Sequence, residues 1–138
     1  MKTILKIKIS SILLISVVIT GTCLAQDNQW KAPAQANELI NPVNGDFKAT
    51  MKGKKIYEKL CWSCHDMKGT GNGPASTALS PKPANYTSEK VQKQSDGAIY
   101  WKISNGKGQM ASFDQTLSDE QRWMLVNYIR LLGNKKNL

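Results

Sequence analysis

The stretch CWSCH at positions 61–65 constrains this chain more than any other feature. It holds two of the three cysteines and the only histidine among 138 residues. Helical spacing leads into it, because Ile56 and Leu60 are four apart. The middle of the chain that follows is rich in Gly, Pro and Ser, so few residues remain to build a core. Domains this small often need a disulfide, a metal or a cofactor to stabilise the fold, and CWSCH is the candidate site for one.

Several kinds of site use two cysteines at this spacing. A disulfide between Cys61 and Cys64 closes too short a loop to restrain the fold, and thioredoxin-like redox pairs follow a strand rather than a helix. A structural zinc site needs four ligands, and no Cys or His follows His65, so only a carboxylate could complete one. C-x-x-C-H is the specific signal of c-type haem attachment. We therefore predict one haem c, bound covalently through Cys61 and Cys64, with His65 as the proximal iron ligand.

The second axial ligand is sought among the methionines, because no second histidine exists. Methionine is a soft ligand that raises the reduction potential. Met67 is too close to His65 to reach the opposite face, and Met51 and Met124 lie on predicted helices, where packing is the usual role. Met110 lies in a predicted loop 45 residues after His65. A loop of that length can pass around a porphyrin, so Met110 is the predicted ligand and core packing is its alternative.

The N-terminus has the pattern of an export signal. A basic region precedes an apolar run of 12 residues, too short to span a bilayer comfortably, and a cleavage site follows Ala25. An uncleaved anchor and a lipidated Cys23 are the alternatives, although Thr20 fits the lipidation pattern poorly. The predicted localisation is periplasmic or extracytoplasmic, with a membrane anchor only if one of these alternatives holds.

The predicted organisation has three parts. Residues 1–25 are a signal peptide, residues 26–47 a polar leader or linker that packs loosely, and residues 48–138 the folded domain. Loss of the signal peptide, which has three lysines and no acid, lowers the formal net charge from +9 to +6. A basic surface of this kind fits acidic partners or anionic membranes. Nucleic acid is not predicted, because the lysines are scattered and no reading motif is present.

The folded domain is predicted to be all-α, with three to four helices. Helical segments are expected over 49–61 and 95–106, and a short one over 75–79. The clearest helix follows a capping box of Ser118 and Gln121 and stops at Gly133. Its buried stripe is predicted to be Leu125, Tyr128, Ile129 and Leu132.

With these residues identified, the chain resembles class I cytochrome c, the small monohaem carriers of the bacterial periplasm, over residues 48–133. The resemblance rests on CWSCH, the Met110 loop, the terminal helices and the stretch GTGNGP. It implies a small fold around one haem, in which the first and last helices cross. Gly53, Tyr57 and Tyr128 occupy the family's positions at that crossing, and the missing Cβ of Gly53 would allow a close approach.

The resemblance also implies residues around the haem. Pro74 matches the family's proline whose carbonyl accepts a hydrogen bond from the proximal histidine. Trp101 and Tyr86 are candidates for lining the haem pocket or for donating to a haem propionate, with plain core packing as the alternative. Ala111 stands where the family often has proline after the ligand methionine.

The predicted function is single-electron transfer without substrate turnover, because His65 and Met110 together leave no open position on the iron. The predicted partners are redox proteins with acidic docking surfaces, which a basic rim would attract. A haem-bearing subunit docked in a larger redox enzyme is the alternative, and a sensor is disfavoured because no output domain is present. The candidate steering residues are Lys68, Lys82, Lys102 and Lys107.

Overall fold

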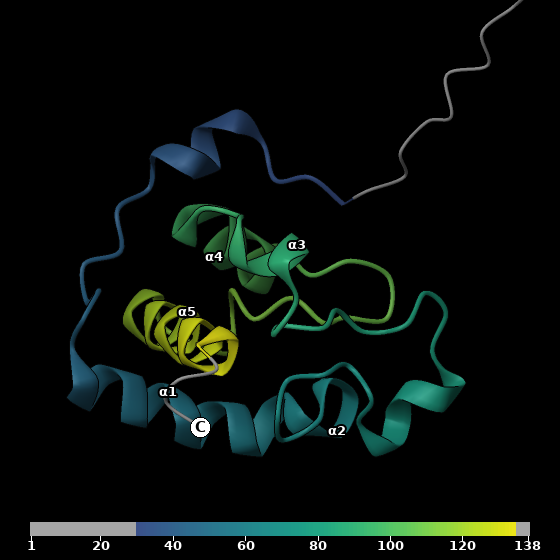
Figure 1. Cartoon of the computed structure of the whole chain (residues 1–138). Helices are drawn as coiled ribbons and strands as arrows, with labels where there is room; N and C mark the ends of the chain where they lie inside the picture. Colours follow the sequence, from purple (N-terminus) through teal and green to yellow (C-terminus); the bar gives the residue numbers. More distant parts are fainter. Residues whose placement is uncertain (1–29, 135–138) are drawn as a thin grey trace, which may run out of the picture.

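The structure is a computed structural model that describes residues 30–134 (Figure 1). The predicted signal peptide and Cys23 lie outside these residues. The described part is all-α, as predicted, and an isolated bridge between Lys107 and Met110 is its only β-type pairing. It has more helices than the three to four expected. Its elements are η1 (Ala34–Glu38), α1 (Phe47–Leu60), α2 (Trp62–His65), η2 (Pro74–Ala78), α3 (Glu89–Gln92), α4 (Asp96–Asn105) and α5 (Asp119–Gly133).

Side-chain caps begin the three longest helices, and α1 starts at Phe47, two residues earlier than predicted. Asp46 caps α1 by accepting a hydrogen bond from the amide of Ala49 at 3.0 Å. Ser95 caps α4 in the same way. Both bonds of the capping box of Ser118 and Gln121 form at the start of α5.

The crossing of α1 and α5 is the centre of the fold (Figure 1). The predicted stripe of α5 is buried, with Leu125 and Leu132 each 1% exposed. A Cβ on Gly53 would lie 2.0 Å from the backbone oxygen of Met124, so only glycine permits this approach. The rings of Tyr57 and Tyr128 meet edge to face with centroids 5.1 Å apart. The crossing contacts implied by the family resemblance are therefore present.

Residues 30–46, which we call the strap, are held more tightly than a loosely packed leader. The strap passes over α4 and descends to the start of α1 (Figure 1). The Asn41 amide, buried in the strap, donates to the carboxylate of Asp96 at 2.9 Å and to the side-chain oxygen of Asn127 at 2.8 Å. Asn127 donates in turn to the backbone oxygen of Val43 at 2.6 Å. The polar sequence resembles a linker, but its amides satisfy groups of α4 and α5.

The 3₁₀ helix of the strap lies directly on α4. A Cβ on Gly97 would come within 1.9 Å of the backbone oxygen of Ala36, so the two backbones are in contact. Ser95 also donates to the side-chain oxygen of Asn37 at 2.7 Å. Within residues 30–134, no helix combines the length and apolar character needed to cross a membrane.

Candidate haem-attachment site

The two cysteines lie where α1 passes into α2. The amide of Cys61 still bonds to Tyr57 in α1, while its carbonyl accepts from the amide of His65 at 2.9 Å and from that of Cys64 at 3.2 Å. One short turn therefore presents both cysteines and the histidine. Tyr57 reinforces it by donating its hydroxyl to the carbonyl of Asp66 at 2.6 Å.

Both thiols are free and half-buried. Burial raises the pKa of Cys61 to about 12, and the neighbouring Cys64 acts in the same direction. Redox-active C-x-x-C pairs work through a thiol whose pKa is lowered. The raised pKa of Cys61 therefore opposes a thioredoxin-like redox pair. Both thiols are free and lie on one turn, where they are available for covalent attachment.

The imidazole of His65 is buried and oriented from both nitrogens. Its Nδ1 lies 3.0 Å from the carbonyl oxygen of Ala84, which can only accept, so Nδ1 carries the proton. Burial lowers the pKa of His65, against the opposing effect of this bond, so the ring is neutral and Nε2 holds a lone pair. Tyr86 stacks on the ring at 4.3 Å, and its hydroxyl is 3.1 Å from Nε2. A neutral, fixed imidazole is the form that ligates metals.

The hydrogen-bond acceptor of His65 Nδ1 differs from the one that the family resemblance implied. The acceptor is the carbonyl of Ala84 rather than that of Pro74, which instead begins η2 and is exposed. The path of the loop explains the difference, because the amide of Tyr86 bonds to the carbonyl of Gly69 at 2.7 Å. This bond returns the chain to α2 only after η2, so residues beyond the helix reach the ring.

The stretch GTGNGP packs directly against the end of α2. The amide of Gly73 bonds to the carbonyl of Cys64 at 3.1 Å, and that of Gly71 bonds to the carbonyl of His65 at 2.9 Å. A Cβ on Gly73 would lie 2.4 Å from the backbone oxygen of Ser63. Glycine at this position therefore lets the loop close over the cysteine turn.

Met110 lies in a well-defined turn between α4 and α5. Its backbone exchanges two hydrogen bonds with Lys107, at 3.0 and 3.1 Å, and its side chain is half-buried. Ser112 ties the loop to α4 by donating to the carbonyl of Ser104 at 2.5 Å. Among residues 30–134, no hydrogen bond links Met110 to His65. The structure thus shows a loop held by hydrogen bonds to itself and to α4, and ligation by Met110 stays a prediction.

The comparison with known families decides the class of this site. The match is to the family described as cytochrome c oxidase, cbb3-type, subunit III, and it spans residues 48–129. The chain belongs to this family. It is a cytochrome c, the class for which CWSCH is the attachment motif.

Solved structures give the same class. The chain is 35% identical to a chain of the Kuenenia stuttgartiensis reducing HAO-like protein complex Kustc0457/Kustc0458, with a TM-score of 0.58. That match covers 62% of this cytochrome and 44% of the other chain. A second match, titled KustC0563 c-type cytochrome, is 27% identical, covers 58% of this chain and 95% of that one, and has a TM-score of 0.51. No curated protein matches the chain.

The donors present in this cytochrome fit haem c. Two free thiols for thioethers stand beside a neutral histidine whose Nε2 lone pair is available for iron in place of the Tyr86 hydroxyl. Within the described part of the chain, no three Cys, His, Asp or Glu side chains gather as a metal-binding group. The zinc alternative therefore has no supporting cluster there.

Trp101 lies on α4, away from the cysteine turn in sequence, and its ring meets that of Trp30 at 6.3 Å. Lys102 lies over the ring of Trp30 at 5.5 Å. Trp30 therefore pins the strap to α4. A haem contact of Trp101 stays a prediction, since no ring contact within residues 30–134 joins it to His65.

Sequence reasoning missed the carbonyl of Ala84. Every residue carries a carbonyl, so nothing in the side-chain pattern marks this one. Tyr86 was a candidate for the pocket, but its contact with His65 depends on the return of the loop after η2. The sequence offered only the proline-rich stretch SPKPANY, which predicts an extended backbone. It does not predict that this backbone returns to His65.

Proposed function

We propose that this cytochrome is a single-electron carrier with one haem c, bound through Cys61 and Cys64. Haem c supplies a one-electron couple between ferrous and ferric iron. The observation that carries the proposal is the neutral, doubly anchored His65 beside two free thiols. The hydrogen bond to Ala84 fixes the ring and raises its basicity as a ligand.

We propose Met110 as the second axial ligand, supported by its fixed, half-buried position in the α4–α5 loop. With His65 and Met110 both holding the iron, no coordination position would remain for a substrate, so we propose no substrate turnover by this protein alone. A preformed loop also suits electron transfer, because little has to move when the charge on the iron changes.

The proposed site of action is outside the cytoplasmic membrane, since the N-terminal pattern is that of an export signal and haem c is attached there. The proposed partners are redox proteins with acidic surfaces. Lys68, Lys82 and Lys107 are exposed and suit this role. Lys102 suits it less, because it is half-buried, hydrogen-bonded to Gln94 and has a pKa lowered by burial and by neighbouring lysines.

A second candidate function is that of a haem-bearing subunit held in a larger redox enzyme. It is favoured by the match to a chain whose printed title names a protein complex. This cytochrome spans less than half of that chain, so the complex itself is not transferred. Size-exclusion chromatography of the exported protein separates the two functions, because a carrier elutes as a monomer.

The ligands are tested by spectroscopy of the exported, haem-loaded protein. We expect a thioether-haem spectrum and a sulfur-to-iron band in the red that disappears in Met110→Ala. Met67→Ala is the matched control, because Met67 is exposed and lies beside the cysteine turn. Retention of the band in Met110→Ala would refute the assignment of Met110. A colourless exported protein would refute the carrier proposal as a whole.

A further inference from the structure

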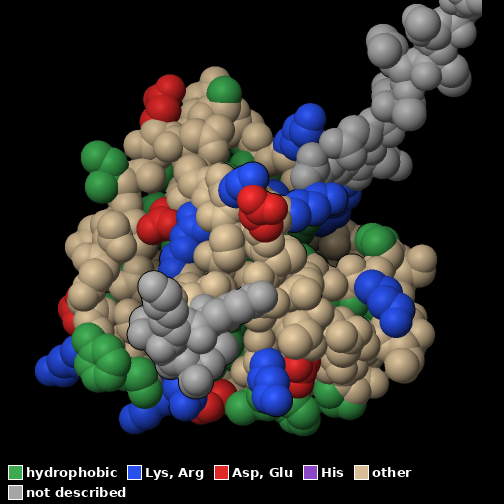
Figure 2. All heavy atoms as spheres, in the orientation of Figure 1, with side chains coloured by type: hydrophobic (Ala, Val, Ile, Leu, Met, Phe, Trp, Pro, Cys, Tyr) green, Lys and Arg blue, Asp and Glu red, His purple; other side chains and the backbone are tan. Residues whose placement is uncertain are grey.

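Helix α1 carries a row of lysines that the proposed site does not use. Lys48, Lys52, Lys55 and Lys59 follow i, i+4, i+7 and i+11, so they share one face of the helix. All four are exposed, and Lys and Arg side chains recur along the lower edge of Figure 2, where α1 runs. We call these four residues the lysine row.

Within residues 30–134, no carboxylate forms an ion pair with the lysine row. The one carboxylate on α1, Glu58, pairs with Lys54, which lies outside the row, at 3.7 Å. Among residues 30–134, no other ion pair involves a lysine of α1. The row therefore presents concentrated, unpaired positive charge along a helix of 14 residues, or about 21 Å.

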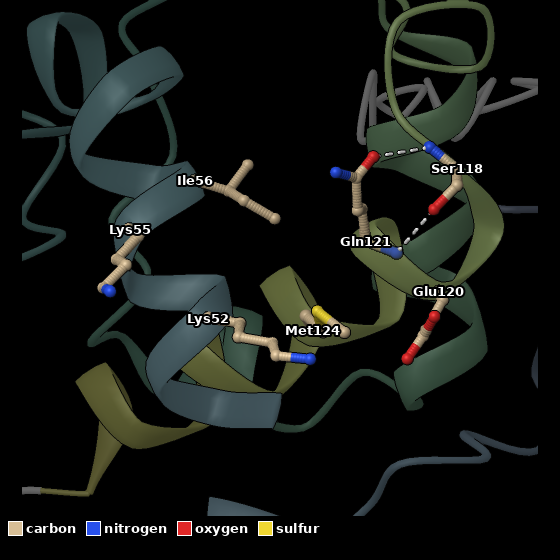
Figure 3. A pocket seen from close by; sticks show the side chains of 7 residues that line it. All are labelled: Lys52, Lys55, Ile56, Ser118, Glu120, Gln121 and Met124. Atoms are coloured by element: carbon tan, nitrogen blue, oxygen red, sulfur yellow. Dashed lines mark hydrogen bonds between the residues drawn. The ribbon is translucent and has the colours of Figure 1, made fainter. Parts of the chain in front are cut away.

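A groove of about 530 Å³ runs beside the row, between α1 and the beginning of α5 (Figure 3). Ile56 and Met124 provide its apolar surface, while Lys52 and Lys55 stand on the α1 side. The capping box of α5 forms the opposite wall, and Glu120 contributes a carboxylate there. The complete lining is Lys52, Lys55, Ile56, Ser118, Glu120, Gln121 and Met124.

We propose that this face is a docking surface for an acidic, amphipathic segment of a partner protein. Carboxylates of the segment pair with the lysine row, and its apolar side chains enter the groove over Ile56 and Met124. A concave groove favours a protein over an anionic membrane, because a flat bilayer surface cannot fill it. The single carboxylate of Glu120 lies on the far wall and leaves the row itself uniformly positive.

This surface differs from the lysines proposed to meet redox partners. Lys68, Lys82 and Lys107 lie in the segments after α2, η2 and α4, whereas the docking surface belongs to α1 and the start of α5. The inference goes beyond electron transfer, because binding here does not require a change of redox state. A partner could therefore bind this surface without contacting the segments that carry Lys68, Lys82 and Lys107.

The test uses the haem-loaded protein and a synthetic helical peptide of about 14 residues, the length of α1, with Glu on one face and Leu on the other. Binding is measured by fluorescence anisotropy at low and physiological salt. Lys52→Gln/Lys55→Gln is the test variant and Lys31→Gln/Lys90→Gln the control, since both remove two exposed positive charges and Lys31 and Lys90 belong to neither proposed surface. Identical helical circular dichroism and haem spectra establish that both variants are folded, and the same spectra test the proposed function separately.

We expect the test variant to bind the peptide about tenfold more weakly and the control variant less than about twofold more weakly. A peptide with the same charges and Ser in place of Leu should also bind more weakly, because the groove is left unfilled. Equal losses in the two variants, or no binding by the wild-type protein, would overturn the proposal. Anionic vesicles that bind in the same Lys52-dependent way, while the peptide does not, would replace it with a membrane surface.

Discussion

Replacing Gly53 by alanine tests the closest contact in the fold. The new Cβ would lie 2.0 Å from the backbone oxygen of Met124 and 2.5 Å from its carbonyl carbon, whereas ordinary contact begins at 3.4 Å. The helices α1 and α5 must therefore separate by roughly 1.4 Å along this contact, and a gap of 0.5–1 Å already removes a quarter to a half of the dispersion attraction. The contact of Tyr57 with Tyr128 lies in the same interface.

Overpacking usually costs about 1–3 kcal/mol, and rigid backbone on both sides places this case near 4 kcal/mol. The helix propensity of alanine offsets about 1 kcal/mol of that loss. We expect Gly53→Ala to lower the free energy of unfolding by about 3 kcal/mol, which corresponds to a Tm about 12–24 °C lower for a domain of this size.

The assay is guanidinium and thermal unfolding of the haem-loaded protein, followed by helical circular dichroism. Gly108→Ala is the control, because a Cβ there meets nothing within 4 Å and only the φ of +58° disfavours it, by about 1–2 kcal/mol. If Gly53→Ala is no less stable than Gly108→Ala, the helices do not approach as closely as described and the reasoning fails.

Three further predictions concern the strap and the cysteine turn. Gly97→Ala should push the strap off α4 and speed its cleavage in limited proteolysis; unchanged resistance would contradict the backbone contact. Asn41→Leu should lower the free energy of unfolding by about 2–4 kcal/mol in guanidinium titrations, because it leaves the side-chain oxygen of Asn127 and the backbone amide of Val43 without their Asn41 partner. The same loss from an exposed substitution such as Asn44→Leu would argue against this buried network. Cys61→Ala/Cys64→Ala should prevent compact folding through the loss of haem, and a normal cooperative thermal transition of the haem-free chain would disprove that dependence.

Much of this fold is specified by local signals. The i, i+3 and i+4 spacing in α5 is enough to name four of its buried residues, and its capping box is complete within four residues. The class of the site is equally local, because CWSCH places two thiols and an imidazole on one turn wherever that turn lies. Such features depend on neighbours in the chain, so they are readable without knowing its path.

The strap is a segment whose structure could not be predicted from its own residues. Its composition is that of a linker, but Asn41 bonds to groups 55 and 86 residues away and is buried by them. A polar side chain in a sequence does not reveal whether water or another part of the protein will satisfy it. Only the packing of η1 on α4 decides that.

The sequence by itself determined that this protein carries paired cysteines, a single histidine and a capped C-terminal helix, and the family resemblance implied the crossing of the terminal helices at Gly53. The tertiary structure alone decided that Ala84, rather than Pro74, holds the imidazole. It also decided that the lysines of α1 border a groove formed with Met124. The physical reason is that spacing along the chain sets which side chains share a helix face, whereas the route of the loops sets which distant groups meet that face.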